Sequence, residues 1–393
     1  MPAQGRTSHP AAGPATHLAI GLAALVLIAL GIAAGPGWFD RHFLPSFGQT
    51  RAFQWGMVQA FRLLLGAAGL VLLLWVRPWA LRAIGRGAGR DALISFLSIV
   101  LAVAASVTAT ELILRARTWR ATQENAPRKE PERRPDALLG WDLAPGRTRR
   151  VEIDGRAIDY ATDALGNRAA SPAHRIDFER PTVLLAGESI MFGYGLGWND
   201  TIAARLEAAL GVQVANLAVP AYGTDQAYVR LRRELPRFAR PMAVVILFTP
   251  FLLDRNLDRD RPHLDARLRW HAAEPPPLRL VELGRRLVRY RGEAAIAEGV
   301  AMTQNALRAA TAAARARGAE AIIVVPQFLP EDPSERAVRN RVLDAAHSPY
   351  LLVPLDPRWR LSVDRHPDPH GAAAIAAALS LRLRHLASPR PAR

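Results

Sequence analysis

The sequence predicts an α/β fold, a three-layer α/β/α sandwich with a parallel sheet, preceded by three transmembrane helices. The sandwich is predicted because short apolar runs alternate with helix-length segments over residues 181–393, and strands joined by helical crossovers form parallel sheets. The transmembrane helices are predicted because three long apolar stretches with few charges occur within residues 1–114. The chain is therefore expected to contain a membrane region and a globular region.

The predicted membrane region has spans at about residues 18–34, 56–76 and 92–114. A secretory signal peptide is the alternative for the first span, but the apolar stretch is long and two further spans follow it. Four arginines lie in the short loop between the second and third spans, so the positive-inside rule places that loop in the cytoplasm. This predicts a multi-pass protein of the cell (inner) membrane, embedded in the lipid bilayer, whose C-terminal domain is periplasmic or extracellular.

Two segments are expected between the spans and the sandwich. Residues 115–137 are charged and contain prolines without an apolar period, which indicates a linker. Residues 138–180 contain short strand-like runs separated by turn residues, which indicates a β-rich lead-in. Within the sandwich, residues 255–291 are rich in arginine and proline and interrupt the strand and helix alternation. We expect this insert to form a lid or one flank of the cleft.

Regular elements are expected throughout the sandwich from the period of its apolar residues. The predicted strands are residues 182–186, 213–217, 243–248 and 320–325. The predicted helices are residues 201–210, 225–235, 293–317 and 371–386.

The composition excludes several classes of function. The chain has no cysteine, which excludes disulfides, thiolate zinc sites and a cysteine nucleophile. Its net charge of +16 would ordinarily suggest nucleic acid, but the arginines are spread along the whole chain, so no nucleic-acid partner is predicted. His263 and His271 lack paired ligands at zinc spacing, so neither a metal nor a cofactor is expected. The few charges in the spans argue against a channel or transporter.

Ser189, Asp364 and His366 carry the strongest functional signal. Ser189 follows the strand at residues 182–186, and ligands of doubly wound sheets bind at the carboxyl ends of the strands. Alone, such a serine is commonly a helix cap, and Asp-x-His is commonly a surface turn. Together they supply a nucleophile, a base (His366) and a carboxylate that orients the base (Asp364). His370 is a second candidate base, although its place before a helix suits a cap residue.

Three sequence blocks resemble those of the SGNH, or GDSL-type, hydrolase superfamily, in particular its membrane-linked bacterial members. The blocks read GESIMFGYG from Gly187, NLAVPAYGT from Asn216 and DRHPDPHG from Asp364, and the resemblance covers roughly residues 138–386. It implies an ester hydrolase or acyl transferase with Ser189, His366 and Asp364 as the catalytic residues. The oxyanion and substrate-binding groups that it implies or leaves as candidates are Ala221, Gly223, Asn216 and Asn256.

The chain departs from the pattern of this superfamily at three positions. Glu188 stands where aspartate is usual, and Ala221 stands where the second block has a glycine whose backbone N–H helps to bind the oxyanion. The asparagine of the third block is missing, and Phe251 occupies its position. Loss of one such donor typically lowers kcat by about 10²- to 10³-fold. Asn256 and Thr249 are the candidates to replace it.

The sequence thus predicts a membrane-anchored serine esterase that acts on O-acetyl or other acyl groups of a glycan or lipid outside the cytoplasm. The Asp-x-His spacing resembles that of relatives that handle acetyl groups on exported polysaccharides. Two alternatives stay open. An O-acyltransferase would use the same triad with a sugar hydroxyl as the acceptor. A non-catalytic module that binds acylated glycan in an export or assembly complex would account for the missing asparagine.

Overall fold

The computed structural model describes residues 12–85, 89–122 and 129–387. The chain forms two compact units. Unit 1 comprises Met1–Phe43, Thr50–Arg120 and Pro277–Tyr290, and unit 2 comprises Leu44–Gln49, Ala121–Pro276 and Arg291–Arg393. Residues 44–49 and 277–290 therefore belong to a different unit from their neighbours in sequence, which the sequence did not predict.

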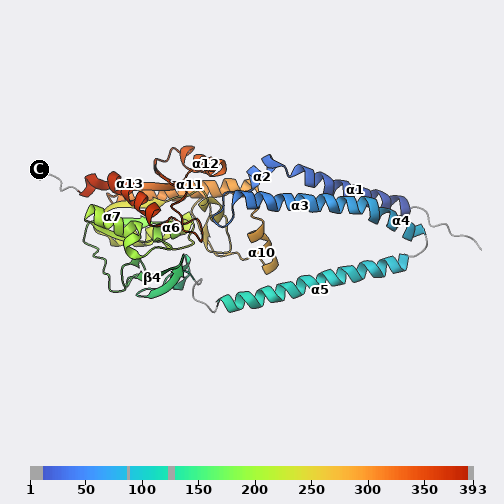
Figure 1. Ribbon diagram of the computed structural model, residues 1–393, viewed down its shortest axis with the longest axis horizontal. Helices are drawn as coiled ribbons and strands as arrows, with labels where there is room; N and C mark the ends of the chain where they lie inside the picture. The colour runs from blue at the N-terminus through green and yellow to red at the C-terminus, as the bar shows by residue number, and fades with distance from the viewer. Residues whose placement is uncertain (1–11, 86–88, 123–128, 388–393) are drawn as a thin grey trace, which may run out of the picture. The chain divides into compact units, whose positions relative to one another are not determined.

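Unit 1 is helical. Its helices are α1 (Ala12–Ala33), α2 (Pro36–His42), α3 (Arg51–Val71), a π-helical turn (Leu72–Val76), α4 (Arg77–Gly85), α5 (Gly89–Thr122) and α10 (Arg279–Leu287). Helices α1 and α3 run side by side (Figure 1). Their close approach depends on Gly69, because a Cβ atom there would lie 2.7 Å from Ile28 Cγ1 and 2.8 Å from the carbonyl oxygen of Ala24.

One helix of the described residues, Arg51–Ala80, is long and apolar enough to cross a membrane by itself. A second candidate is the pair Leu18–Ala33 and Pro36–His42, which is bent by 76° where Pro36 cannot continue the preceding helix. Among the described residues there is thus one candidate span, or two if the bent pair is a single span, whereas three spans were predicted. The third predicted span, residues 92–114, lies in α5, part of whose side chains falls outside the described residues.

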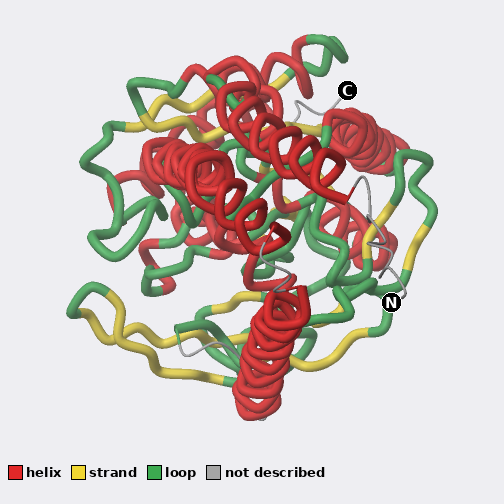
Figure 2. The backbone as a smooth tube through the Cα atoms, turned by 90° about the vertical axis from the view of Figure 1, so that its right-hand side faces the viewer, coloured by secondary structure: helices red, strands yellow, loops and turns green. Residues whose placement is uncertain are grey.

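Unit 2 contains an eight-stranded sheet in the order β12-β11-β8-β6-β7-β5-β4-β3 (strands yellow in Figure 2). The strands are β3 (Thr148–Ile153), β4 (Arg156–Thr162), β5 (Arg168–Ala169), β6 (Thr182–Ala186), β7 (Gln213–Asn216), β8 (Pro241–Leu247), β11 (Glu320–Phe328) and β12 (Tyr350–Leu355). From β12 to β7 all neighbours are parallel, whereas β5, β4 and β3 add antiparallel strands. The sheet is thus mostly parallel, and the predicted lead-in extends it.

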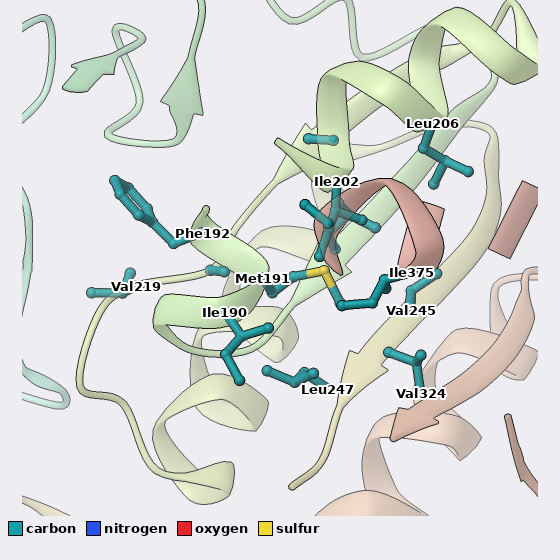
Figure 3. Close-up of a cluster of buried hydrophobic side chains, with 14 of the residues drawn as sticks. Ile190, Met191, Phe192, Ile202, Leu206, Val219, Val245, Leu247, Val324 and Ile375 are labelled. Carbon is teal, nitrogen blue, oxygen red and sulfur yellow. The ribbon is translucent and has the colours of Figure 1, made fainter. Parts of the chain in front are cut away.

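Helices cover both faces of this sheet because its inner strands are apolar on both sides. On one face, α7 (Ile202–Leu210) and α13 (Pro369–Ala387) contribute to the larger apolar cluster; Figure 3 shows Ile202, Leu206 and Ile375 from these helices with Val245, Leu247 and Val324 from the sheet. On the other face, α8 (Thr224–Glu234) and α11 (Glu293–Ala316) pack against the alternate residues of the same strands. This is the three-layer arrangement of the prediction.

The predicted linker is shorter than expected. Helix α5 continues to Thr122, and β1 (Arg133–Asp136) pairs with β2 (Gly140–Leu143) in a separate hairpin. The charges of β1 are not those of a solvated linker, because Asp136 forms an ion pair with Arg233 at 2.7 Å. Residues 123–128 of the predicted linker lie outside the described residues.

Several elements were not predicted. They are α6 (Ser189–Phe192), α9 (Leu252–Arg255), the hairpin β9 (His263–Leu264) with β10 (Trp270–His271), α12 (Pro333–Arg339) with a π-helical turn (Asn340–Asp344), and β12. Strand β12 is an edge strand that contains Pro354, and a proline within an apolar run argues against a strand.

Candidate active site

A sharp turn after β6 presents Ser189 at the carboxyl end of the sheet. Gly187 is required in this turn, because a Cβ atom there would lie 2.8 Å from Leu247 Cβ. Glu188 is the N-cap of α6, and its Oε1 accepts a hydrogen bond from the backbone N–H of Ile190 at 3.0 Å. Ser189 is the first residue of α6 and is 6% exposed. Figure 3 shows how Met191, two residues further on, anchors this short helix in the core.

His366 lies in the loop between β12 and α13 and reaches Ser189. Its Nε2 is 2.7 Å from Ser189 Oγ, and its Nδ1 is 2.8 Å from Asp364 Oδ1. Asp364 Oδ1 also accepts the backbone N–H of His366 at 2.9 Å, which fixes the turn. A carboxylate only accepts, so in the neutral ring Nδ1 carries the proton and the lone pair of Nε2 faces the serine. The structure brings together the three residues that the sequence selects.

His370, the second candidate base, is not at this site. Its side chain is 75% exposed and pairs with Asp368 at 3.3 Å beside the start of α13. The position is that of a surface cap residue.

The environment keeps Asp364 ionised. Burial alone would raise the pKa of this carboxyl, but the hydrogen bonds and the charge of His366 outweigh burial, and the pKa lies below its ordinary value. The ionised carboxylate can therefore offset the positive charge that His366 gains when it takes a proton.

Two aromatic rings enclose the imidazole of His366. Tyr194 stacks on it with ring centroids 4.3 Å apart, and Phe47 contacts it with centroids 4.5 Å apart. Burial raises the pKa of Tyr194 to about 12, so this phenol stays neutral. The sequence did not select either residue. Tyr194 lies within the first motif, whereas Phe47 is far away in sequence and carries no motif.

The hydroxyl of Ser189 has a second acceptor beside it. Glu188 Oε2 contacts Ser189 Oγ and also pairs with Arg255 Nη1 at 3.2 Å, and Glu188 is almost fully buried. Arg255 in turn donates to the carbonyl oxygen of Tyr222 at 3.1 Å. Because a serine hydroxyl has one proton, Glu188 and His366 compete for it.

Ala221 has an unusual backbone conformation. Its φ of 67° lies in the left-handed region that favours glycine, and its carbonyl oxygen accepts a hydrogen bond from Arg261 Nη1 at 2.8 Å. Within the part of the chain that the structure describes, we find no acceptor for the backbone N–H of Ala221 or of Ser189. Both N–H groups are thus available to a ligand.

Two other predicted donors, Gly223 and Asn216, are engaged in the protein's own hydrogen bonds. The Gly223 N–H donates to Gln226 Oε1 at 3.0 Å. The Asn216 side chain donates to the carbonyl oxygen of Met191 and accepts from the N–H of Ala218. These contacts shape the loop that carries Ala221 and engage the Gly223 N–H and the Asn216 amide within the protein.

Asn256 does not replace the missing asparagine either. Its Nδ2 donates to Thr224 Oγ1 and to Thr303 Oγ1, and its Oδ1 accepts the N–H of Thr224, all within the core. Thr249 differs. Its hydroxyl is buried and has no hydrogen-bond partner among the described residues. Of the two candidate side-chain donors, Thr249 is the one left available.

The predicted insert contributes to the site through its first residues. Arg255 donates to Glu188, and Arg261 donates to the carbonyl oxygen of Ala221. The β9–β10 hairpin is attached to α8, because the Leu264 N–H donates to Asp225 Oδ2 at 3.2 Å. Residues 277–290 of the insert belong to unit 1. The insert is therefore divided between the two units.

The chain is similar to solved structures of lipolytic and carbohydrate-active esterases. One is a lipase/acylhydrolase from Enterococcus faecalis, with 17% identity, coverage of 54% of this chain and 100% of that one, and a TM-score of 0.34. Another is a member of the lipolytic protein G-D-S-L family from Veillonella parvula, with 10% identity, coverage of 51% and 97%, and a TM-score of 0.33. A third is a family two carbohydrate esterase from Clostridium thermocellum, in complex with cellohexaose, with 12% identity, coverage of 57% and 68%, and a TM-score of 0.34.

These neighbours bear the names of a lipase/acylhydrolase, a lipolytic G-D-S-L protein and a carbohydrate esterase, the class that the resemblance in the sequence names. No family model and no curated protein matches the chain.

Proposed function

We propose that this protein is a membrane-anchored serine esterase that removes acyl groups, acetyl above all, from a glycan or lipid outside the cytoplasm. The proposal is carried by two contacts of the His366 imidazole. Its Nε2 is 2.7 Å from Ser189 Oγ, and its Nδ1 is 2.8 Å from Asp364 Oδ1. A serine hydroxyl becomes a nucleophile when such a base takes its proton and a carboxylate orients that base.

The reaction proceeds through an acyl-enzyme. Ser189 Oγ attacks the ester carbonyl carbon while its proton moves to His366 Nε2, and the new C–O bond gives a tetrahedral oxyanion. The C–O bond to the alcohol then breaks, and the alcohol oxygen leaves with the proton from His366. Water attacks the acyl-enzyme in the same way, with His366 again as the base, and releases the carboxylic acid and free Ser189. Asp364 stabilises the imidazolium in both steps.

The oxyanion is held by the free backbone N–H groups of Ser189 and Ala221, with the Thr249 hydroxyl as the side-chain donor. Backbone donors that need no reorganisation stabilise the transition state strongly. The left-handed conformation of Ala221 turns its carbonyl toward Arg261 and keeps the N–H free. Thr249 replaces the absent asparagine because its hydroxyl has no other described partner.

The apolar helices of unit 1 support membrane anchoring. Helix Arg51–Ala80 has a mean hydropathy of 2.0 over its most apolar window, and only 11% of that window is buried. The positive-inside rule, applied to the loop arginines of the sequence, favours a periplasmic or extracellular esterase domain. An acylated glycan or lipid is the substrate class that such a domain would encounter.

The test uses the full-length protein in detergent with p-nitrophenyl acetate and a fluorophosphonate probe. We expect turnover and labelling of Ser189, and we expect both to be lost in Ser189→Ala and His366→Ala. His370→Ala is the matched control, because it removes a histidine with the same aspartate spacing outside the site, and it should retain activity. An inert wild-type protein would refute the esterase and favour a module that binds acylated glycan.

An acyltransferase is distinguished by the acceptor. If the acetyl group of p-nitrophenyl acetate passes to an added sugar faster than to water, mass spectrometry will detect the acetylated sugar. Release of acetate alone supports the hydrolase. Both outcomes require the same Ser189 acyl-enzyme.

A further inference from the structure

A small cavity lies beside the triad. It has a volume of about 30 Å³. Its apolar walls include Phe47, Phe251, Phe328 and Ile190, the residue after the nucleophile. Thr249, the proposed oxyanion donor, lines the same space. Because Ile190 follows the nucleophile, this cavity is the candidate site for the carbon chain of an acyl group bound to Ser189.

The charged groups at the cavity, Glu335 and Arg365, are paired with each other, whereas Thr249 Oγ1 and Gln327 Oε1 have no hydrogen-bond partner among the described residues. The carboxylate of Glu335 accepts from Arg365 Nη2 at 3.1 Å and from Gln327 Nε2 at 2.7 Å. These groups need no charged partner from a ligand, so the space suits an apolar chain end. This chemistry fits the alkyl part of an acyl group.

Phe47 comes from residues 44–49, the segment between α2 and α3 that belongs to unit 2. Leu44 is buried in the core of unit 2, and the carbonyl oxygen of Ser46 accepts from Arg365 Nη1 at 3.4 Å. The Phe47 ring then packs against Phe251 with centroids 5.0 Å apart and against His366. Leu44 and Ser46 thus attach the segment to unit 2, and Phe47 forms one wall of the cavity.

The cavity volume limits what can enter it. A water-sized group requires about 10–15 Å³ of such volume, so about two groups of this size fit. The methyl group of an acetyl ester meets this limit. The longer chain of a butyryl or hexanoyl ester exceeds it unless Phe47 moves.

We propose that Phe47 sets the acyl-chain length that this site accepts, restricting it to acetyl and similarly short groups. This inference rests on the proposed esterase function. On this proposal, the segment between α2 and α3 determines the substrate specificity of Ser189. The segment has no catalytic motif and is far from Ser189 in the sequence.

The experiment compares kcat/KM for p-nitrophenyl acetate, butyrate and hexanoate in full-length wild type, Phe47→Ala and Phe47→Leu. Wild type is expected to prefer acetate. In Phe47→Ala the ratio of hexanoate to acetate kcat/KM should rise by roughly 10- to 200-fold, the range by which one methylene group is discriminated in a pocket. Phe47→Leu should fall between the two. Phe178→Ala, which removes a ring packed on Phe238 elsewhere in unit 2, is the control and should leave the ratio unchanged.

The possible outcomes separate this inference from the esterase proposal. If wild type cleaves no ester and Ser189 is not labelled by the phosphonate, the esterase proposal fails. If Ser189 is labelled and acetate is cleaved, but Phe47→Ala leaves the ratio unchanged, only the specificity inference fails. An equal loss of activity toward all three esters would show that Phe47 positions His366, and would also overturn the inference.

Discussion

Replacing Glu188 by glutamine is expected to raise the rate of ester cleavage. The Glu188 carboxylate contacts Ser189 Oγ and competes with His366 for its only proton. Glutamine keeps the size of the side chain, and its Oε1 can still accept the Ile190 N–H that caps α6. Its amide nitrogen would donate to Ser189 Oγ, which leaves the serine proton for His366.

The size of the effect follows from the two competing hydrogen bonds. A bond to a charged acceptor contributes about 1.5–3 kcal/mol and one to a neutral acceptor about 0.5–1.5 kcal/mol. The midpoints of these ranges differ by about 1.3 kcal/mol, which corresponds to a factor of roughly ten in the population of the reactive hydroxyl. We expect kcat/KM for p-nitrophenyl acetate to rise by about ten-fold in Glu188→Gln.

The same substitution should lower stability. Arg255, whose side chain is 17% exposed, would lose its ion pair with Glu188 and keep its bond to the Tyr222 carbonyl. We expect a loss of about 1–3 kcal/mol in the free energy of unfolding. Rates should therefore be normalised to active sites titrated with the phosphonate. Glu298→Gln, at a half-exposed carboxylate on α11, is the control and should change neither quantity much. A fall in kcat/KM in Glu188→Gln alone would refute the competition.

Three further substitutions test other parts of the site. The pKa of Asp364 lies below its ordinary value, so the ionised group stabilises the fold above about pH 3.9, and this contribution is lost as the pH falls below that value. Asp364→Asn should lower kcat by about 10²- to 10⁴-fold. It should also make the melting temperature less sensitive to acid below about pH 4. An unchanged kcat would contradict the triad. Ala221→Gly should raise the free energy of unfolding by about 1 kcal/mol, because a φ of 67° strains a residue that has a side chain. It should leave kcat unchanged, since the backbone N–H stays. Lower stability on denaturant unfolding would argue against this strain. Thr249→Val should lower kcat by about 10²-fold without lowering the melting temperature, because the hydroxyl has no described partner to lose, and an unaltered kcat would exclude it as an oxyanion donor.

The elements of the sandwich were predictable because their signals are local. Strand β6 was expected at residues 182–186 and runs Thr182–Ala186, and α11 was expected at residues 293–317 and runs Glu293–Ala316. Both have a sustained apolar period. Strand β12 was missed because Pro354 interrupts its apolar run, and a proline is tolerated in a strand only in places such as the edge of a sheet, which the sequence does not reveal.

The donors around the oxyanion were less predictable from the sequence. Asn256 was a reasonable replacement for the missing asparagine, but the fold places it against Thr224 and Thr303, where all its bonds are internal. Thr249 has no motif of its own, and only its unpartnered hydroxyl in the cavity wall distinguishes it. Whether a polar side chain is available to bind a ligand depends on the residues that surround it in the fold. The sequence alone does not show which residues these are.

The sequence by itself determined the α/β alternation and the apolar helices, and it selected Ser189, Asp364 and His366, because periodicity, turn residues and short motifs are properties of neighbouring residues. Only the tertiary structure decided that Glu188 competes for the serine proton, that Ala221 is left-handed, and that residues 44–49 place Phe47 on His366. Those features arise from the packing of segments that are distant in the sequence. Core contacts and side-chain pairing decide which groups meet there, and local conformational preference does not.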